Sequence, residues 1–263
     1  MIKEVETFEL NQVKHIILVA SGKGGVGKST VAAQLALSLA QKGFRIGLLD
    51  ADIHGPSVPT LFGLESERPL SEEINGETRI VPFEKCGLRI MSLGFFFKPE
   101  QAVLWRGPMV TKALKQMMTE TNWGDLDYLI VDTPPGTGDV HITLVQQFHV
   151  DGVVIVTTPQ KMALADVQKA MSMFREPHIN IPILAVVENM SWFTPEKHQD
   201  ERYYLFGQGG GAELCKHFGV SNLIQIPTNE QLCRDSDEGN TEKALENASL
   251  RRSFEELIKT LPK

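Results

Sequence analysis

The chain has 263 residues, of which 42% are hydrophobic, and its formal net charge is −7. This length is sufficient for one large α/β domain, and the negative charge argues against a strong general affinity for nucleic acid. No run of about 18 apolar residues occurs, and the acidic first stretch, MIKEVETFEL, has no long apolar segment, so we expect neither a membrane-spanning helix nor a signal peptide.

A glycine-rich loop follows the first predicted strand, residues 15–20 (HIILVA). Residues 22–29, within SGKGGVGKST, fit the phosphate-loop pattern G-x-x-x-x-G-K-[ST]. Glycines carry no Cβ atom, so backbone N–H groups can close on a polyphosphate. Lys28 would place a positive charge on the β- and γ-phosphates, and the Ser29 hydroxyl would ligate Mg²⁺. A helix predicted over residues 28–42 would direct its N-terminus at the phosphates. The residues expected to bind ATP here are Gly22, Lys23, Gly24, Gly25, Val26, Gly27, Lys28, Ser29 and Thr30.

A second lysine, Lys23, follows the first glycine, although the phosphate-loop pattern does not require it. The run KGGVGKST resembles the loop of the deviant Walker-A ATPases, the class that holds MinD, ParA, ArsA and nitrogenase iron protein. The resemblance implies that Lys23 reaches across a dimer to the nucleotide of the partner. There it would neutralise charge on the transferred phosphoryl group, as an arginine finger does. The alternative is a solvated loop lysine.

The second predicted strand, residues 45–50, ends in the acidic pair Asp50 and Asp52. The carboxyl ends of strands are where α/β folds bind ligands. One carboxylate can orient the attacking water while the other supports Mg²⁺. In the deviant class the second aspartate belongs to the switch I segment, so we assign the water to Asp52 and the Mg²⁺ shell to Asp50. An acidic turn without function is the alternative.

The next segment, residues 61–85, is polar and acidic and is predicted to be a surface excursion with a small hairpin around Asn75-Gly76. A strand is predicted over residues 88–93 and a helix over residues 108–121. The apolar positions of this helix have helical spacing and are expected to face the core. They are Met109, Val110, Ala113, Leu114, Met117 and Met118.

A buried strand over residues 128–131 leads into the run DTPPGTGD, which begins at Asp132. Asp132 fits the Walker-B role of binding Mg²⁺ directly or through water. Gly136 could offer its backbone N–H to the γ-phosphate and so sense the loss of that phosphate. A turn with a purely structural role is the alternative, but a second nucleotide motif in the correct order favours a function.

Further buried strands are predicted over residues 152–156, 183–187 and 223–226, with a helix over residues 162–174 between the first two. The region from Thr241 onward is helical and alternates in charge, which favours a docked helix over a membrane-targeting one. Apolar strands alternating with helices indicate an α/β fold with a mostly parallel sheet covered on both faces. We expect a single P-loop NTPase domain over residues 1–263.

Two residues are candidates for contacts with the nucleotide base. Asn189 ends the run ILAVVEN, and in the deviant class an asparagine at this place hydrogen-bonds the adenine. Pro227, in IPTN, matches a loop that flanks the base. Strand-end asparagines and loop prolines are also common for turn geometry alone.

Six motifs together narrow the resemblance: SGKGGVGKST, LLDADIHGPSVPTLFG, WRGPMV, LIVDTPPGTGDVHITL, VTTPQKMALADV and VENMSWF. They are similar to those of the Mrp (ApbC) family of iron–sulfur cluster carrier ATPases, and the match runs over about residues 13–228. The resemblance implies a Mg²⁺-dependent, homodimeric ATPase. Such an ATPase would hold an iron–sulfur cluster at its dimer interface and pass it to apoprotein clients.

The chain departs from that family in its cysteines. Family members carry a C-x-x-C shortly after the ENMS stretch, and two such pairs supply the four thiolates of a bridging cluster. Here residues 192–207 contain no cysteine, and Cys86, Cys215 and Cys233 are scattered. Scattered cysteines favour a reducing cytoplasm over a disulfide framework, and they argue against a metal site within one chain. We expect poor cluster binding, with any residual binding dependent on Cys215 or Cys233.

A second function is therefore kept open. The chain could be a nucleotide-gated switch, similar to MinD or ParA, that dimerises on ATP and recruits a protein partner without any cluster. An aromatic run would then form the partner surface, although ordinary packing is the alternative. It comprises Trp192, Phe193, Tyr203, Tyr204 and Phe206.

Overall fold

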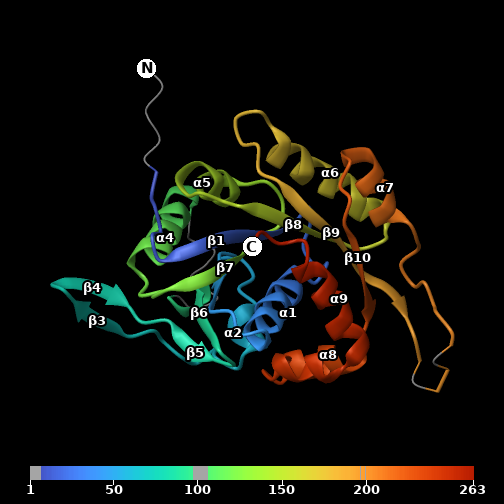
Figure 1. Ribbon diagram of the computed structural model, residues 1–263, viewed down its shortest axis with the longest axis horizontal. Coiled ribbons are helices and arrows are strands. Elements are labelled where there is room, and N and C mark those ends of the chain that lie inside the picture. Colours follow the sequence, from blue (N-terminus) through green and yellow to red (C-terminus); the bar gives the residue numbers. More distant parts are fainter. Residues whose placement is uncertain (1–6, 97–105, 196, 199) are drawn as a thin grey trace.

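Eight strands form one sheet in the order β10-β9-β8-β1-β7-β2-β6-β5 (Figure 1). The computed structural model of the chain describes residues 7–96, 106–195, 197–198 and 200–263. Neighbouring strands are parallel except for the edge strand β5, which runs antiparallel to β6. The strands are β1 (Val13–Ser21), β2 (Ile46–Asp50), β5 (Phe83–Lys85), β6 (Leu88–Ser92), β7 (Leu126–Asp132), β8 (Gly152–Thr157), β9 (Ile183–Phe193) and β10 (Leu223–Thr228).

Helices cover both faces of this sheet. In Figure 1, α4, α5, α6 and α7 lie above the sheet, and α1, α2, α8 and α9 lie below it. The helices are α1 (Lys28–Gln41), α2 (Val58–Leu61), α4 (Gly107–Glu120), α5 (Asp139–Gln147), α6 (Lys161–Arg175), α7 (Gly210–Phe218), α8 (Glu230–Asp237) and α9 (Ala248–Ile258), with 3-10 turns η1 (Leu93–Phe95) and η2 (Thr241–Glu246). The predicted α/β fold with a mostly parallel, doubly covered sheet is confirmed. Among the residues that the structure describes, no helix is both long and apolar enough to span a membrane.

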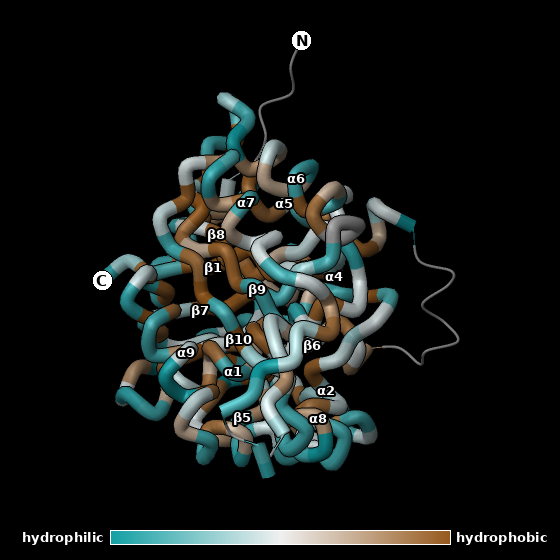
Figure 2. Tube along the Cα trace, turned by 90° about the vertical axis from the view of Figure 1, so that its right-hand side faces the viewer, coloured by the Kyte–Doolittle hydropathy of each residue, from teal (hydrophilic) through white to brown (hydrophobic). Residues whose placement is uncertain are grey.

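The central strands read as continuous apolar runs because both of their faces are buried. On β1, Ile17 and Val19 belong to the core below the sheet, whereas Ile16 and Leu18 belong to the core above it. Figure 2 shows the hydrophobic segments gathered around β1 and β8, with hydrophilic segments on the outer turns. This burial on two faces is typical of parallel sheets and explains why these strands could be predicted without alternation.

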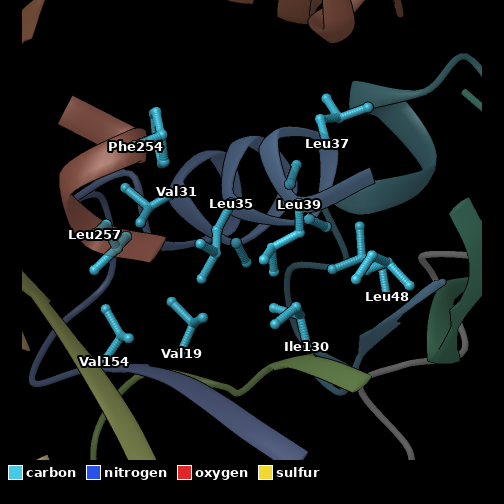
Figure 3. Close-up of a cluster of buried hydrophobic side chains, with 14 of the residues drawn as sticks. Val19, Val31, Leu35, Leu37, Leu39, Leu48, Ile130, Val154, Phe254 and Leu257 are labelled. Atoms are coloured by element: carbon cyan, nitrogen blue, oxygen red, sulfur yellow. The ribbon is translucent and has the colours of Figure 1, made fainter. Parts of the chain in front are cut away.

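In the core below the sheet, α1 and α9 lie side by side against the strands (Figure 3). Leu35 and Leu39 of α1 are wholly buried and face strand residues such as Ile130. Phe254 and Leu257 of α9 belong to the same cluster and lie beside α1. Each such side chain contributes roughly 1.5–3 kcal/mol by its burial. The predicted docking of the last helix on the domain is confirmed, and it holds α1, the helix that follows the phosphate loop.

One residue of the predicted core stripe on α4 lies outside the core. Val110, Leu114, Met117 and Met118 are buried, but 50% of Met109 is exposed to solvent. Met109 stands one position before the stripe, a rotation of about 100° around the helix axis, which turns its side chain away from the sheet. Trp105, in the motif WRGPMV, lies outside the described residues.

Strand β9 is longer than the sequence predicted, because the polar residues after Val187 do not end it. It continues to Phe193, and the N–H groups of Phe193 and Tyr203 each donate to the carbonyl of the other at 2.8 Å. After Phe193, which still pairs with Thr228 of β10, the chain continues into the loop at the right of Figure 1. The predicted hairpin is confirmed as β3 (Ser71–Ile74) and β4 (Glu77–Ile80), joined by Asn75-Gly76 with positive φ at both turn residues.

Candidate nucleotide-binding site

The loops that follow β1, β2 and β7 border one cavity of about 510 Å³ at the carboxyl end of the sheet. Parallel strands bring their carboxyl ends to one edge, so three motifs far apart in the sequence meet there. The lining residues are Ser21, Lys23, Gly24, Gly25, Gly27, Lys28, Ser29, Thr30, Asp52, His54, Gly55, Ser57, Pro134 and Pro135.

The glycines of the phosphate loop are needed for different reasons. A Cβ on Gly22 would lie 2.2 Å from the backbone nitrogen of Val167, so Gly22 permits α6 to pack against the loop. Gly27 has φ 81°, and a Cβ there would lie 2.3 Å from Nδ2 of Asn189. In contrast, among the described residues nothing but the chain neighbours lies within 4 Å of the Cβ positions of Gly24 and Gly25. The open space over Gly24 and Gly25 is therefore where a polyphosphate could approach the backbone.

An ion pair lies at the base of the cavity. Nζ of Lys28 donates to Oδ1 of Asp132 at 2.5 Å and to Oγ of Ser29 at 3.5 Å. Asp132 is wholly buried and Lys28 is almost so. Burial raises the pKa of the Asp132 carboxyl, and the nearby Lys28 ammonium opposes that rise. Oδ2 of Asp132 is buried and has no hydrogen-bond partner within the described part of the chain. An unpartnered carboxylate oxygen next to a serine hydroxyl fits the oxygen ligands that Mg²⁺ prefers.

Asp50 holds the turn that carries Asp52. Its carboxylate accepts hydrogen bonds from the backbone N–H of Asp52 at 3.0 Å and of Val58 at 3.2 Å, and from the Ser92 hydroxyl at 3.0 Å. Burial, together with the facing carboxylate of Asp132, raises the pKa of Asp50 to about 8. Both oxygens of Asp50 are thus occupied by protein donors. A part in the Mg²⁺ shell would therefore have to run through water or through exchange of these bonds.

Asp52, in contrast, borders the cavity itself. Its Oδ1 accepts the backbone N–H groups of His54 at 3.1 Å and Gly55 at 3.2 Å. These bonds fix the carboxylate within the turn of residues 52–57, opposite the phosphate loop. The arrangement is compatible with the predicted role of orienting a water molecule.

Lys23 lies at the rim of the same cavity. Its Nζ is 3.4 Å from Oε1 of Gln160, the residue immediately before α6, and its carbonyl accepts the Ser21 hydroxyl at 3.0 Å. The side chain is half-buried. Lys28 is therefore buried beside Asp132, whereas Lys23 is half-buried beside Gln160. The reach of Lys23 across a dimer stays a prediction.

Of the three remaining predicted contacts, Gly136 and Asn189 are hydrogen-bonded to protein groups. The Gly136 N–H donates to the Ser21 carbonyl at 2.8 Å, so a contact with the γ-phosphate requires this bond to be exchanged. Nδ2 of Asn189 donates to the Val26 carbonyl at 2.9 Å, which ties β9 to the phosphate loop. Neither Asn189 nor Pro227 borders the cavity. Their contacts with an adenine stay predictions.

Several residues of the site were not predicted from the sequence. His54 and Ser57 line the cavity, Ser92 holds Asp50, and the buried His141 hydrogen-bonds Thr133. His54, Ser57 and His141 lie within the motifs LLDADIHGPSVPTLFG and LIVDTPPGTGDVHITL. Their place in these motifs is the signal that could have drawn attention to them. Ser92 carries no such signal, because only the pairing of β2 with β6 places it beside Asp50.

The three cysteines are free thiols that stand on different parts of the fold: Cys86 between β5 and β6, Cys215 on α7 and Cys233 on α8. Cys86 and Cys233 are exposed, and Cys215 is partly buried against the core above the sheet. Burial, together with Glu188, raises the pKa of the Cys215 thiol. Within the described ranges, no group of three or more His, Cys, Asp or Glu side chains is placed to hold a metal ion.

Comparison with known proteins gives one consistent relationship. The family described as ParA, NUBPL iron-transfer P-loop NTPase, matches residues 12–262. The chain is 54% identical over 228 residues to an iron-sulfur cluster carrier protein of Aquifex aeolicus, covering 86% of this chain and 61% of that protein. For the protein of the same name in Escherichia coli K12, the identity is 46% over 232 residues, with 88% and 61% covered. The chain thus spans 61% of the length of both relatives.

Solved structures agree with this relationship. A nucleotide-binding protein of Archaeoglobus fulgidus in complex with ADP has a TM-score of 0.79 and 36% identity, with 93% of each chain covered. The cell division ATPase MinD of Pyrococcus furiosus has a TM-score of 0.64 and 17% identity, with 94% of this chain and 98% of that chain covered, and it shares the fold alone. The sheet therefore has counterparts in solved structures, and the chain belongs to the NUBPL iron-transfer P-loop NTPase family.

Proposed function

We propose that this chain is a Mg²⁺-dependent ATPase whose nucleotide cycle serves the transfer of iron–sulfur clusters. The observation that carries the ATPase is the buried contact of Lys28 with Asp132 at the base of the phosphate loop. Lys28 Nζ is the charge that a bound triphosphate would attract. On leaving Asp132, it would expose a carboxylate of which one oxygen already lacks a partner.

Ser29 and Asp132 are the residues that would hold Mg²⁺ in this site. When bound, the ion supplies positive charge to the phosphate oxygens and to the buried Asp132 carboxylate. The chain's own contribution is to bind the phosphates through the backbone around Gly24 and Gly25 and through Lys28. Asp52 would orient the attacking water from the facing turn. Electrostatic stabilisation of this kind is the main way in which P-loop enzymes accelerate phosphoryl transfer.

We propose further that the active form is a homodimer in which Lys23 of each chain acts on the nucleotide of the other. The side chain already borders the cavity, where Gln160 is its hydrogen-bond partner. A cation on the transferred phosphoryl group would raise the rate of hydrolysis without being needed for binding. A cytoplasmic location and apoprotein clients, both expected from the sequence, belong to the same proposal.

Cluster transfer rests on the family and on relatives named iron-sulfur cluster carrier proteins. The cluster would be cargo, and a [4Fe–4S] cluster normally needs four thiolates. Because the three cysteines of this chain form no local pair, we propose that the chain binds a cluster weakly by itself. A client or partner would then have to supply part of the ligands.

The ATPase proposal is tested by calorimetric titration of ADP into the wild type and into Asp132→Asn, with and without Mg²⁺. We expect Mg²⁺ to strengthen binding to the wild type and to have little effect on the variant. Asp125→Asn is the matched control, because Asp125 is an exposed acidic residue just before the other end of the same strand. An equal effect of Mg²⁺ on all three proteins would contradict the proposed metal site.

One observation favours a second candidate, the nucleotide-gated switch without a cluster. Tyr203, Tyr204 and Leu205 are exposed on the loop that follows β9, and Leu205 is 63% exposed. Grouped exposed apolar side chains are typical of protein contacts. If the switch is the function, ATP should dimerise the chain and a partner should bind this loop in the absence of iron. Light scattering with and without ATP tests the dimerisation, and Leu205→Ser is the variant expected to lose the partner but not ATP.

A further inference from the structure

A wholly buried histidine lies behind the loop that follows Asp132. His141 is in the first turn of α5, and its Nε2 is 3.0 Å from Oγ1 of Thr133. The Thr133 hydroxyl donates to the Val19 carbonyl at 3.0 Å. A hydroxyl has one hydrogen, which is spent on Val19, so Thr133 must accept from the ring. The network therefore assigns the hydrogen of the neutral imidazole to Nε2.

Thr133 is held to β1 twice. Its backbone N–H donates to the same Val19 carbonyl at 3.1 Å. Val19 is itself the register partner of Asp132 across β1 and β7. The residue immediately after Asp132 is therefore fixed to the sheet by its backbone, by its hydroxyl and, through that hydroxyl, by His141.

The middle of the loop is held much more loosely. Gly136, with φ 90°, is joined to the end of β1 by the bond from its N–H to the Ser21 carbonyl. Apart from its two chain neighbours, no described residue has an atom within 4 Å of the position of a Cβ on Gly136. Between the two attachments stand Pro134 and Pro135, which line the nucleotide cavity and have restricted φ angles. The loop is thus held by three hydrogen bonds at Thr133 and by the single bond to Ser21 at Gly136.

Packing alone does not explain a histidine at this position. The ring of His141 contacts that of Phe174 edge to face, with the centroids 6.3 Å apart, and a leucine or phenylalanine could fill such a space. Nδ1 of His141 is buried without a partner within the described residues, which disfavours a polar side chain. Burial, with Lys28 nearby, lowers the pKa of His141 to about 4, so the ring is neutral. The property that distinguishes it from an apolar residue is the hydrogen bond that its ring donates to Thr133. The Gly138 and Pro134 carbonyls also interact with the ring, and they oppose the fall of its pKa.

We propose that His141 is a positioning residue for hydrolysis, which fixes Thr133 as the pivot of the loop over residues 133–138. With the pivot fixed, the Gly136 N–H can move from the Ser21 carbonyl to the terminal phosphate while Asp132 stays in place. The proposal rests on the proposed ATPase function and deepens it. His141 does not line the nucleotide cavity, so it acts through the loop, by way of the Thr133 hydroxyl.

Four variants test the pair. His141→Leu and Thr133→Val remove the donor and the acceptor at nearly constant volume, whereas His141→Gln and Thr133→Ser keep a donor and an acceptor in place. We expect the first two to lower kcat about tenfold, the factor for one ordinary hydrogen bond, with KM for ATP nearly unchanged. His141→Gln and Thr133→Ser should recover most of kcat. The double variant His141→Leu/Thr133→Val should lose no more than either single one, because both remove the same bond.

Equal losses in His141→Leu and His141→Gln, or additive losses in the double variant, would overturn the proposal. ADP affinity and thermal unfolding of each variant show whether the fold is intact. A second readout does not depend on turnover: nitrogen-15 NMR of the imidazole in the nucleotide-free wild type. We expect the Nε2–H tautomer, with an Nε2 signal that shifts in Thr133→Val. An Nδ1–H tautomer would overturn the proposed hydrogen bond from His141 to Thr133. A wild type that fails to hydrolyse ATP would overturn the proposed function. The tautomer would still show whether His141 donates a hydrogen bond to Thr133.

Discussion

Lys28 and Asp132, 104 residues apart in the sequence, form a buried ion pair of 2.5 Å at the base of the nucleotide cavity. The pair joins the loop after β1 to the end of β7. Each partner has a predicted ligand other than its present one: a phosphate for Lys28 and Mg²⁺ for Asp132. Nucleotide binding can therefore exchange this pair for two stronger contacts without leaving either charge unpaired, which would be costly in a buried site.

The two lysines of the phosphate loop should separate binding from hydrolysis. Lys28→Ala is expected to weaken ATP binding about a hundredfold, in line with the roughly 2–3 kcal/mol of a hydrogen bond to a charged group. Lys23→Ala should leave ATP binding nearly unchanged and should lower turnover by about a thousandfold, as the loss of an arginine finger does. Affinity and turnover measured for each variant check this division. Equal loss of affinity in both variants would contradict it.

Removing the carboxylate of Asp52 should slow the chemical step and leave phosphate binding intact. Asp52→Ala is expected to lower turnover by about 10²–10⁴, the range for a group that activates water. If ATP drives dimerisation, the variant should persist as an ATP-bound dimer. Size measurement with ATP and Mg²⁺ checks the outcome. Normal hydrolysis by Asp52→Ala would show that another group positions the water.

The buried His141 should make the fold sensitive to acid. Its pKa is about 4 in the folded chain against an ordinary value of 6.5, so the unfolded chain binds more protons between these values. Stability should therefore fall as the pH drops through that window, with His141 accounting for about 2 kcal/mol between pH 7 and pH 5. Lys28 is the charged neighbour that adds to this depression of the pKa.

Urea unfolding of the wild type and His141→Leu at the two pH values checks this prediction. The difference between the two proteins isolates His141 from other titrating groups, such as Asp50. Asp50 acts in the opposite direction, because its pKa is raised to about 8 and its folded form takes up protons as the pH falls. The same pH dependence in both proteins would contradict the role assigned to His141.

The sequence predicts a role for those site residues that stand in short local motifs. Lys28, Ser29 and Asp132 stand in short motifs whose spacing alone indicates the chemistry. The role of Asp50 was harder to predict, because its partners Val58 and Ser92 are fixed only by the turn after β2 and by the pairing with β6. The organisation of the chain as one domain remains a prediction.

The same limit applies to the fold. Apolar strands buried on both faces could be recognised from continuous runs, but the extension of β9 could not. Its polar residues are satisfied by distant partners: Glu188 accepts from Gly211 at 2.6 Å and from Gln225 at 2.8 Å. Gly22 likewise appeared to serve the phosphates, although its closest neighbour is the backbone of α6. Contacts between distant segments decide these cases, and no local pattern reports them.

The scattered cysteines should give a weak cluster site. After anaerobic reconstitution with iron and sulfide, we expect the isolated wild type to hold less than one cluster per dimer. Any bound cluster should be lost in Cys215→Ser or Cys233→Ser, with Cys86→Ser as the control predicted to have the least effect. Iron, sulfide and visible absorbance measure the content. A stable, stoichiometric cluster that survives both substitutions would contradict this prediction.

Release of phosphate from ATP by the purified chain decides whether it is a Mg²⁺-dependent ATPase. The wild type should release phosphate in the presence of Mg²⁺ and should stop when the ion is chelated. Asp132→Asn should be inactive under both conditions, and Asp125→Asn should behave as the wild type. A wild type that releases no phosphate with Mg²⁺, or an Asp132→Asn variant that is as active as the wild type, would contradict the account.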